Sequence, residues 1–422
     1  MTTPHAADRG DVRFGDAARF WIGLGFVNFG GPAGQIALMH RELVDRRRWI
    51  GESSFLHGLS FANLLPGPEA QQLATYVGWR LHGLPGAVLA GTAFVVPSVF
   101  VLLALSYVAT AYGDVPAVAG LLYGVQPVVV AIVVEALVRI GRRTLRRPEH
   151  VAIALATFAA ATFTRIPFPA IVAAAGLAGL ALGSRDPADG APAPAPRGAL
   201  RRLAILAAAF GVLWAVPFAA LVAVRGAGDI VVAFALFFTQ AAFVTFGGAY
   251  AVLAYVAQET VGRGWLSAEQ MVQGLALAES TPGPLIMVLQ HVGFVSAWNA
   301  APADRRVQDA VLGALVTTYV TFLPSFFFIL AGAPYVERLG RDPRVRAALT
   351  GITAAVVGAI LSLASLFALS ALLPAGNVDV LAIALALASF LALRAGLPPF
   401  VAVPLGALVG SAARIALGSI AR

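Results

Sequence analysis

The sequence contains no cysteine and no lysine, and only 12% of its 422 residues are charged. The missing cysteines exclude disulfide bonds and cysteine-based metal or redox chemistry. Without lysine, the formal net charge of +8 comes entirely from arginine. The arginines gather in short stretches between apolar segments, as membrane orientation signals do, so we expect no nucleic-acid partner. Residues 1–17 form a polar tail that lacks the apolar core of a cleavable signal peptide.

Hydrophobic residues are abundant, at 59% of the chain, and the mean hydropathy is +0.83. Apolar runs of about 20 residues, the length that crosses ~30 Å of hydrocarbon, recur throughout. They do not alternate polar and apolar residues as barrel strands would. The 43 glycines and 26 prolines favour closely packed, interrupted helices. The sequence therefore predicts an all-α polytopic membrane protein.

Two Pro-Gly-Pro breaks interrupt apolar segments, one at Pro66-Gly67-Pro68 and one at Pro282-Gly283-Pro284. Proline removes a backbone donor and pushes the preceding residue out of the α region, so each break should end one helix and begin another. In a bilayer such a break is tolerated only where the freed backbone groups are buried in protein or face water. Matched breaks therefore predict a transport site. The alternative is a hairpin turn with no binding role.

Other motifs recur in the same order after residue 230, which indicates two homologous repeats. The matches are Phe29-Gly30-Gly31 with Phe246-Gly247-Gly248, Glu42 with Glu259, Trp49 with Trp265, and Pro97-Ser98 with Pro324-Ser325. We expect a first transmembrane repeat over 18–183, a Pro/Ala linker over 184–199, an unpaired span over 200–224, and a second repeat over 230–418.

The loop charges indicate how the repeats cross the membrane. In the first repeat the loops at 41–48 and 139–147 are rich in arginine, whereas the loop at 112–116 carries only Asp114. In the second repeat the bias is reversed, because the loop that matches 112–116 is the basic one, at 338–346. Under the positive-inside rule, the two repeats should therefore run in opposite directions.

The helix expected after Pro68 carries Glu69, Gln71 and Gln72 in its first turn. Unpaired N–H groups and the positive end of the helix dipole favour an anion there. The turn after Pro284 is apolar, so it offers mainly backbone N–H groups. The polar residues that supplement it are Ser280, Thr281 and Gln290.

Acidic and basic residues near the breaks are further candidates. A carboxylate in hydrocarbon costs about 2.5 to 3.5 kcal/mol, so Glu69 and Glu279 are candidates for proton coupling or gating. Arg41 and Arg80 lie near membrane segments and suit a tetrahedral oxyanion, because the arginine fork donates two parallel hydrogen bonds. For the matched Glu42 and Glu259, the default is an ion pair at helical spacing, with Arg46 and Arg263 respectively.

No phosphate-binding Gly-Lys-Ser/Thr loop, paired aspartate motif, zinc helix or histidine set with metal-ligand spacing occurs in the sequence. We therefore expect a protein that is not an enzyme and uses no metal or cofactor. A membrane enzyme stays a distant alternative.

Several motifs together resemble the chromate ion transporter family in its two-repeat form, from about residue 20 to 418. They are FGGPAGQIALMHREL at 29–43, RRRWIGESSF at 46–55, ANLLPGPEAQQLATYVGW at 62–79, FGGAYAVLAYV at 246–256 and ALAESTPGPLIM at 276–287. The resemblance implies a multi-pass inner-membrane carrier that exports chromate, is driven by the proton motive force and confers chromate resistance. The residues it implies are Gly30, Gly31, Pro32, Glu42, Trp49, Pro66, Gly67, Pro68, Gln71, Gly247, Gly248, Glu259, Trp265, Glu279, Pro282, Gly283 and Pro284.

Taken together, these features give one hypothesis for the site. The two helix starts after the breaks face each other near the midplane, and a chromate dianion sits between their N–H groups. Arg41 or Arg80 guards the entrance, and a proton moves through Glu69 or Glu279. The alternatives are a carrier for sulfate or another oxyanion, and an inverted-repeat anion channel. The expected partners are the anion, protons and the lipid bilayer, with a homodimer as one possible assembly.

Overall fold

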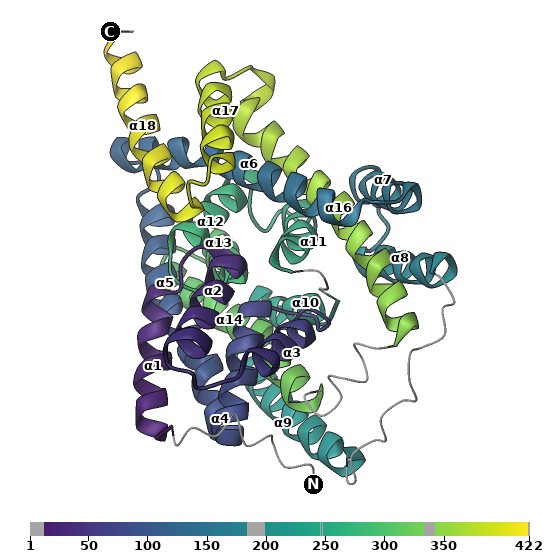
Figure 1. The fold of residues 1–422 in the computed structure, drawn as a ribbon. Coiled ribbons are helices and arrows are strands. Elements are labelled where there is room, and N and C mark those ends of the chain that lie inside the picture. Colours follow the sequence, from purple (N-terminus) through teal and green to yellow (C-terminus); the bar gives the residue numbers. More distant parts are fainter. Residues whose placement is uncertain (1–11, 184–198, 245, 247, 333–341, 421–422) are drawn as a thin grey trace.

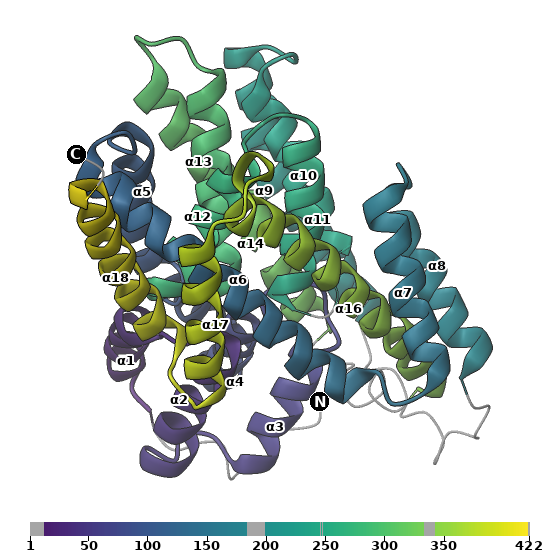
Figure 2. The same cartoon turned by 90° about the horizontal axis from the view of Figure 1, so that it is seen from above.

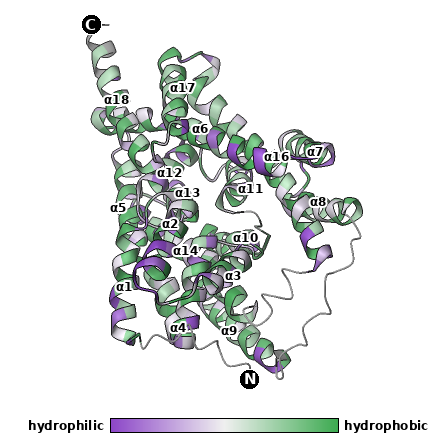
Figure 3. Cartoon of the chain, viewed as in Figure 1, coloured by the Kyte–Doolittle hydropathy of each residue, from purple (hydrophilic) through white to green (hydrophobic). Residues whose placement is uncertain are grey.

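The computed structural model describes residues 12–183, 199–244, 246, 248–332 and 342–420. Within these ranges every regular element is a helix and no strand occurs. Five helical stretches are long and apolar enough to cross a membrane. Hydrophobic residues cover most of the helices, and hydrophilic ones gather at helix ends, for example at the lower ends of α1 and α9 (Figure 3). This confirms the all-α polytopic architecture.

The first repeat consists of nine helical elements in chain order. They are α1 (Phe14–Val27), α2 (Gly31–His40), the π-helix η2 (Arg41–Arg46), α3 (Glu52–Ala62), α4 (Glu69–Ala93), α5 (Val96–Ala111), α6 (Pro116–Thr144), α7 (Pro148–Phe163) and α8 (Phe168–Leu182). The unpaired span is α9 (Ala199–Arg225). The first helix begins at Phe14, inside the predicted polar tail. The predicted linker over 184–199 lies, except for its last residue, outside the described residues.

The second repeat follows the same order. Its elements are α10 (Ile230–Val244), α11 (Ala249–Gly262), α12 (Ala268–Ser280), η3 (Leu285–Met287), α13 (Val288–Ala300), α14 (Arg306–Gly332), α16 (Pro343–Leu372), η5 (Pro374–Gly376), α17 (Val380–Arg394) and α18 (Pro399–Ile420). As expected, both Pro-Gly-Pro breaks separate two helices: α3 from α4 in the first repeat, and α12 from η3 and α13 in the second.

After each break the chain forms a hairpin of two antiparallel helical segments. Within α4, His82 and Gly83 leave the helical region, and Gly83 has a φ of +64°. A side chain on Gly78 would meet the backbone of Gly86, so the two parts of α4 run antiparallel in close contact. In the second repeat α13 and α14 form the matching hairpin, with Gly293 against Gly313.

Each repeat packs its last two helices on the long helix of the other. Helices α7 and α8 pack on α16, and α17 and α18 pack on α6. A side chain on Gly124 of α6 would meet the backbone of Gly406, and one on Gly351 of α16 would meet the backbone of Gly179. Small residues allow this close approach between membrane helices. The exchange interlocks the repeats around α6 and α16, which lie side by side (Figures 1 and 2).

The two long helices run in opposite directions. Arg143, near the end of α6, and Arg346, near the start of α16, line the same cavity. At the other end, Tyr123 of α6 donates to Asp379, which precedes α17, at 2.9 and 3.0 Å. Equivalent helices that run antiparallel are related by a two-fold axis across them, so the repeats are inverted, as the loop charges predicted.

Candidate functional site

The broken segments of the two repeats meet each other. The Gly283 N–H donates to the Asn28 carbonyl at 3.3 Å. The Gln35 side-chain amide donates to the Gly283 carbonyl at 2.6 Å and to the Asn28 carbonyl at 2.8 Å. Asn28 and Gln35 are completely buried. The gap between α1 and α2 is therefore hydrogen-bonded directly to the second Pro-Gly-Pro break.

The reciprocal contact joins the first break to the second repeat. A Cβ on Gly248 would lie 3.2 Å from Oε1 of Glu69. Each of the matched serines also contacts the break of the other repeat. Ser325 lies against Gly67, and Ser98 lies against Gly283. Four interruptions, two from each repeat, thus converge at the interface between the repeats. Of the predicted Phe-Gly-Gly positions, Gly30 and Gly31 have φ of +92° and +65° and lead into Pro32, whereas Gly247 lies outside the described residues.

The first break is polar, and it leaves the first N–H groups of a helix without backbone partners. Among the described residues, the N–H groups of Glu69, Ala70 and Gln71 have no backbone partner. Gln72 donates to the Pro66 carbonyl at 2.7 Å, and Gln71 donates to Thr75 at 3.2 Å. The buried side-chain oxygens of both glutamines have no partner within the described part of the chain. Because an unsatisfied buried polar atom is costly, this arrangement favours a small polar ligand, a proton donor or water at the break.

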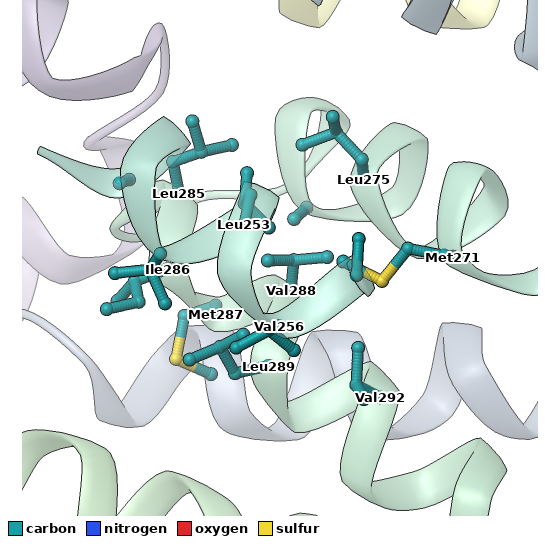
Figure 4. Close-up of a cluster of buried hydrophobic side chains, with 14 of the residues drawn as sticks. Leu253, Val256, Met271, Leu275, Leu285, Ile286, Met287, Val288, Leu289 and Val292 are labelled. Atoms are coloured by element: carbon teal, nitrogen blue, oxygen red, sulfur yellow. The ribbon is translucent and has the colours of Figure 1, made fainter. Parts of the chain in front are cut away.

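The second break is apolar and closed. Leu285, Ile286, Met287 and Val288 point among Leu253, Val256, Met271 and Leu275 in a buried cluster (Figure 4). Ser280 and Thr281 donate to carbonyls of their own helix, Leu277 at 3.0 Å and Ala278 at 3.2 Å.

Gln290, the remaining polar candidate at the second break, is also engaged. It donates to the Val99 carbonyl at 2.8 Å and accepts from Thr318 at 3.2 Å. The three polar residues predicted to supplement this break are therefore occupied by structural hydrogen bonds.

The start of α11 connects the two carboxylates nearest the breaks. Gly248 lies against Glu69, and Tyr250, two residues later, donates to Glu279 at 2.8 Å. Glu279 is 4% exposed. The Glu135–Arg139 ion pair of α6, at 3.3 Å, lies within electrostatic reach of Glu279. Charged and hydroxyl groups thus extend from α6 to the second break.

The other charged candidates lie away from the breaks. Arg41 follows α2, ten residues after Gly31, and Arg80 lies near the hairpin tip, twelve residues after Pro68, which is about 15 to 18 Å along a helix. The Arg41 side chain is exposed. The structure therefore brings neither arginine to the helix starts.

Glu42 and Glu259 belong to matching clusters. Arg47 lies 3.6 Å from Glu42 and 5.0 Å from the Trp49 ring, and Arg263 lies 2.9 Å from Glu259 and 5.2 Å from the Trp265 ring. Arg46 also pairs with Glu42, at 3.3 Å. The predicted ion pairs are confirmed, and they anchor a loop in each repeat.

Sequence reasoning missed several residues at the convergence. Asn28, Gln35 and Tyr250 are polar residues within or beside the Phe-Gly-Gly motifs, and that position could have singled them out. Ser98 and Ser325 were recognised as a repeat match but not as site residues. Among the described residues, no group of three or more acidic or histidine side chains is arranged to hold a metal.

Inverted repeats, apolar helices broken at Pro-Gly-Pro, and buried polar groups where the breaks meet are typical of a multi-pass membrane transporter. The chromate transporter family model matches residues 15–180 and again 232–411. The chain is 36% identical over 349 residues to the chromate transport protein of Pseudomonas aeruginosa, covering 81% of this chain and 78% of that protein. It is 30% identical over 345 residues to the chromate transport protein of Cupriavidus metallidurans, covering 81% and 79%. No solved structure matches significantly.

This chain belongs to the chromate transporter family, in its two-repeat form. Both repeats match the same family model, which confirms that they are homologous.

Proposed function

We propose that the protein exports chromate across the inner membrane, is driven by the proton motive force and thereby confers chromate resistance. The observation that carries this proposal is the first break, where a helix with three free N–H groups begins beside buried glutamines at the interface between inverted repeats. A helix start of this kind attracts a dianion through its N–H groups and dipole. Relatives named as chromate transport proteins support chromate as that dianion.

The proposed binding site is one-sided. Only the first break combines free N–H groups with polar side chains, since the second is covered by Leu285, Ile286 and Met287. We therefore place the anion at Glu69, Ala70 and Gln71. The second break acts as the packed partner against which the first one moves.

The electrical part of the proton motive force suits export of a dianion. An elementary charge moved across 100 mV changes the free energy by about 2.3 kcal/mol, so a dianion leaving a negative interior gains about twice that. Glu69 lies at the proposed anion site, and no arginine of the described residues is within ion-pair distance of it. A carboxylate and a dianion repel each other at this range, so Glu69 is neutral when the anion binds. The carboxylate therefore links proton uptake to anion binding, and a proton that leaves with the dianion reduces the exported charge to −1, which an inside-negative membrane potential still drives outward.

Transport in sealed proteoliposomes tests this proposal. Chromate release is followed with a potassium diffusion potential and a pH gradient imposed separately, for the native protein and for Glu69→Gln, with Glu42→Gln as a matched control. We expect saturable flux that an inside-negative potential accelerates. Glu69→Gln should lose the response to the pH gradient, because it cannot exchange a proton, while Glu42→Gln retains it.

Two results would contradict the proposal. Flux that does not saturate would indicate a channel. Sulfate flux without chromate flux would keep the oxyanion carrier but replace its substrate, since sulfate has nearly the same shape and charge.

A further inference from the structure

A cavity of about 730 Å³ opens at one end of the interface between the repeats. It is lined by the end of α6, the start of α7, the end of α8 and the start of α16. Its basic side chains are Arg143, Arg146, Arg147, His150 and Arg346, and no acidic side chain of the described residues lines it. None of these four arginines has a carboxylate within ion-pair distance among the described residues. The cavity therefore carries a strong positive potential.

The cavity also extends to the residues just before the first break. Leu64, which lies two residues before Pro66, is part of its lining. The remaining wall is largely small or apolar, including Ile153, Gly179 and Leu182. A low-dielectric wall around charges of one sign concentrates the field and raises the local concentration of the opposite ion.

The equivalent place at the other end of the molecule is closed. The inverted repeats pair the start of α7 with the start of α17, and the recurring AIALA at 152–156 and 382–386 pairs Asp379 with Glu149, the neighbour of His150 at the open cavity. There, Tyr123 donates to both oxygens of Asp379, and Arg414 lies 5.0 Å from the Tyr123 ring. These contacts join α6, α17 and α18. One end is thus an open basic cavity, while the other end is held together by a polar cluster in which Asp379 accepts from Tyr123. Alternating access requires such a difference between the two ends.

We infer that this cavity is the loading vestibule of the transporter, a second anion site that takes tetrahedral dianions and delivers them to the first break. The inference rests on the proposed function and adds the side of entry and the residues that attract the substrate. Arg143, Arg146 and Arg147 come from one repeat and Arg346 from the other, so both repeats build the vestibule. A phospholipid headgroup has similar chemistry, and the test must separate it from a free anion.

The absence of cysteine permits a test that does not depend on transport. Thr350→Cys places one thiol in the cavity lining, and Ala117→Cys places one on an exposed turn at the opposite end of α6. Each protein, purified in neutral detergent, is labelled with an anionic and a cationic methanethiosulfonate reagent. For each position we take the ratio of the labelling rate with the anionic reagent to the rate with the cationic one. We expect this ratio to be about tenfold higher at position 350 than at position 117, because the cavity attracts anions.

The vestibule arginines are then removed in pairs. Arg147→Gln with Arg346→Gln should abolish this preference at position 350, whereas the control pair Arg305→Gln with Arg306→Gln, at the exposed start of α14, should leave it unchanged. Sulfate should slow labelling at 350 by the anionic reagent, and it is used because chromate oxidises thiols. Protection by phosphatidylglycerol but not by sulfate would overturn the inference in favour of a lipid site.

Equal rate ratios at positions 350 and 117 would also overturn it. Because the readout is labelling, failure of the vestibule is distinguishable from failure of the proposed function, which the flux assay reports. If both hold, Arg147→Gln with Arg346→Gln should raise the chromate KM about tenfold and weaken its salt dependence without lowering the maximal rate.

Discussion

Pro66-Gly67-Pro68 and Pro282-Gly283-Pro284 turn the chain in the same way, since Gly67 and Gly283 have φ of +122° and +114°. A serine of the opposite repeat lies against each glycine. Their surroundings differ. The first break opens a helix whose N–H groups are free beside Gln71 and Gln72, and the second is sealed by an apolar cluster and tied to Asn28 and Gln35. The inverted repeats therefore keep one backbone path in two different surroundings, one polar and one apolar.

The largest expected effect is on stability at the second break. Gly283→Ala combines a backbone conformation that side chains rarely adopt with a collision between the new Cβ and Ser98. We expect a loss of about 3 to 5 kcal/mol, measured as a lower melting temperature in detergent. Gly67→Ala should cost less, about 1 to 3 kcal/mol, because its Cβ meets only the ends of Gln72 and Ser325, at 2.7 and 2.8 Å. Equal losses would remove this distinction between the breaks.

The second prediction compares one glutamine near each break. Gln72→Met removes the hydrogen bond to the Pro66 carbonyl at the proposed site, so the chromate KM should rise about tenfold to a hundredfold. Gln290→Met loses its bond to Val99 and should lower the melting temperature while leaving KM within about twofold. Saturation curves in proteoliposomes measure both. If Gln290→Met raised KM as much as Gln72→Met, both breaks would bind substrate.

A smaller effect is expected at Tyr250. Tyr250→Phe leaves the packing of α11 but removes the hydrogen bond to Glu279, a change of about 1 to 2 kcal/mol. The pH dependence of flux should shift if Glu279 shares in proton transfer and stay unchanged if Glu69 alone carries the proton. Tyr255→Phe, on the same helix, serves as the control, and the pH profile of chromate flux is the measurement.

The smallest effect is expected in the matched anchor clusters. Arg47→Met and Arg263→Met each remove a partly exposed ion pair and a cation–π contact, so each should lower stability by about 1 kcal/mol. The two losses should be similar, and chromate KM should not change. If only one of the two variants had a transport defect, the two clusters would differ in function although their structures are alike. The two breaks, in contrast, also differ in their surroundings.

Much of the architecture could be predicted from local sequence features. Proline and glycine dictate where helices stop, so the breaks at residues 66–68 and 282–284 were predictable. The order of repeated motifs indicated two repeats, and the reversal of arginine between matched loops predicted their inversion, which the shared cavity of Arg143 and Arg346 bears out. The ion pairs of Glu42 and Glu259 followed from helical spacing alone.

The tertiary structure alone decided which polar groups are free. Gln71 and Gln290 are both glutamines near a break, yet the oxygen of one has no partner and the other is bonded to Val99 and Thr318. Such bonds depend on which residue of a distant segment packs opposite, and helix-forming patterns carry no information about that. The contacts of Tyr250 with Glu279, of Gln35 with Gly283, and of four arginines around one cavity likewise required the repeats to interlock. Local sequence determined the helices and their breaks, and packing between the repeats determined which break keeps polar groups without hydrogen-bond partners.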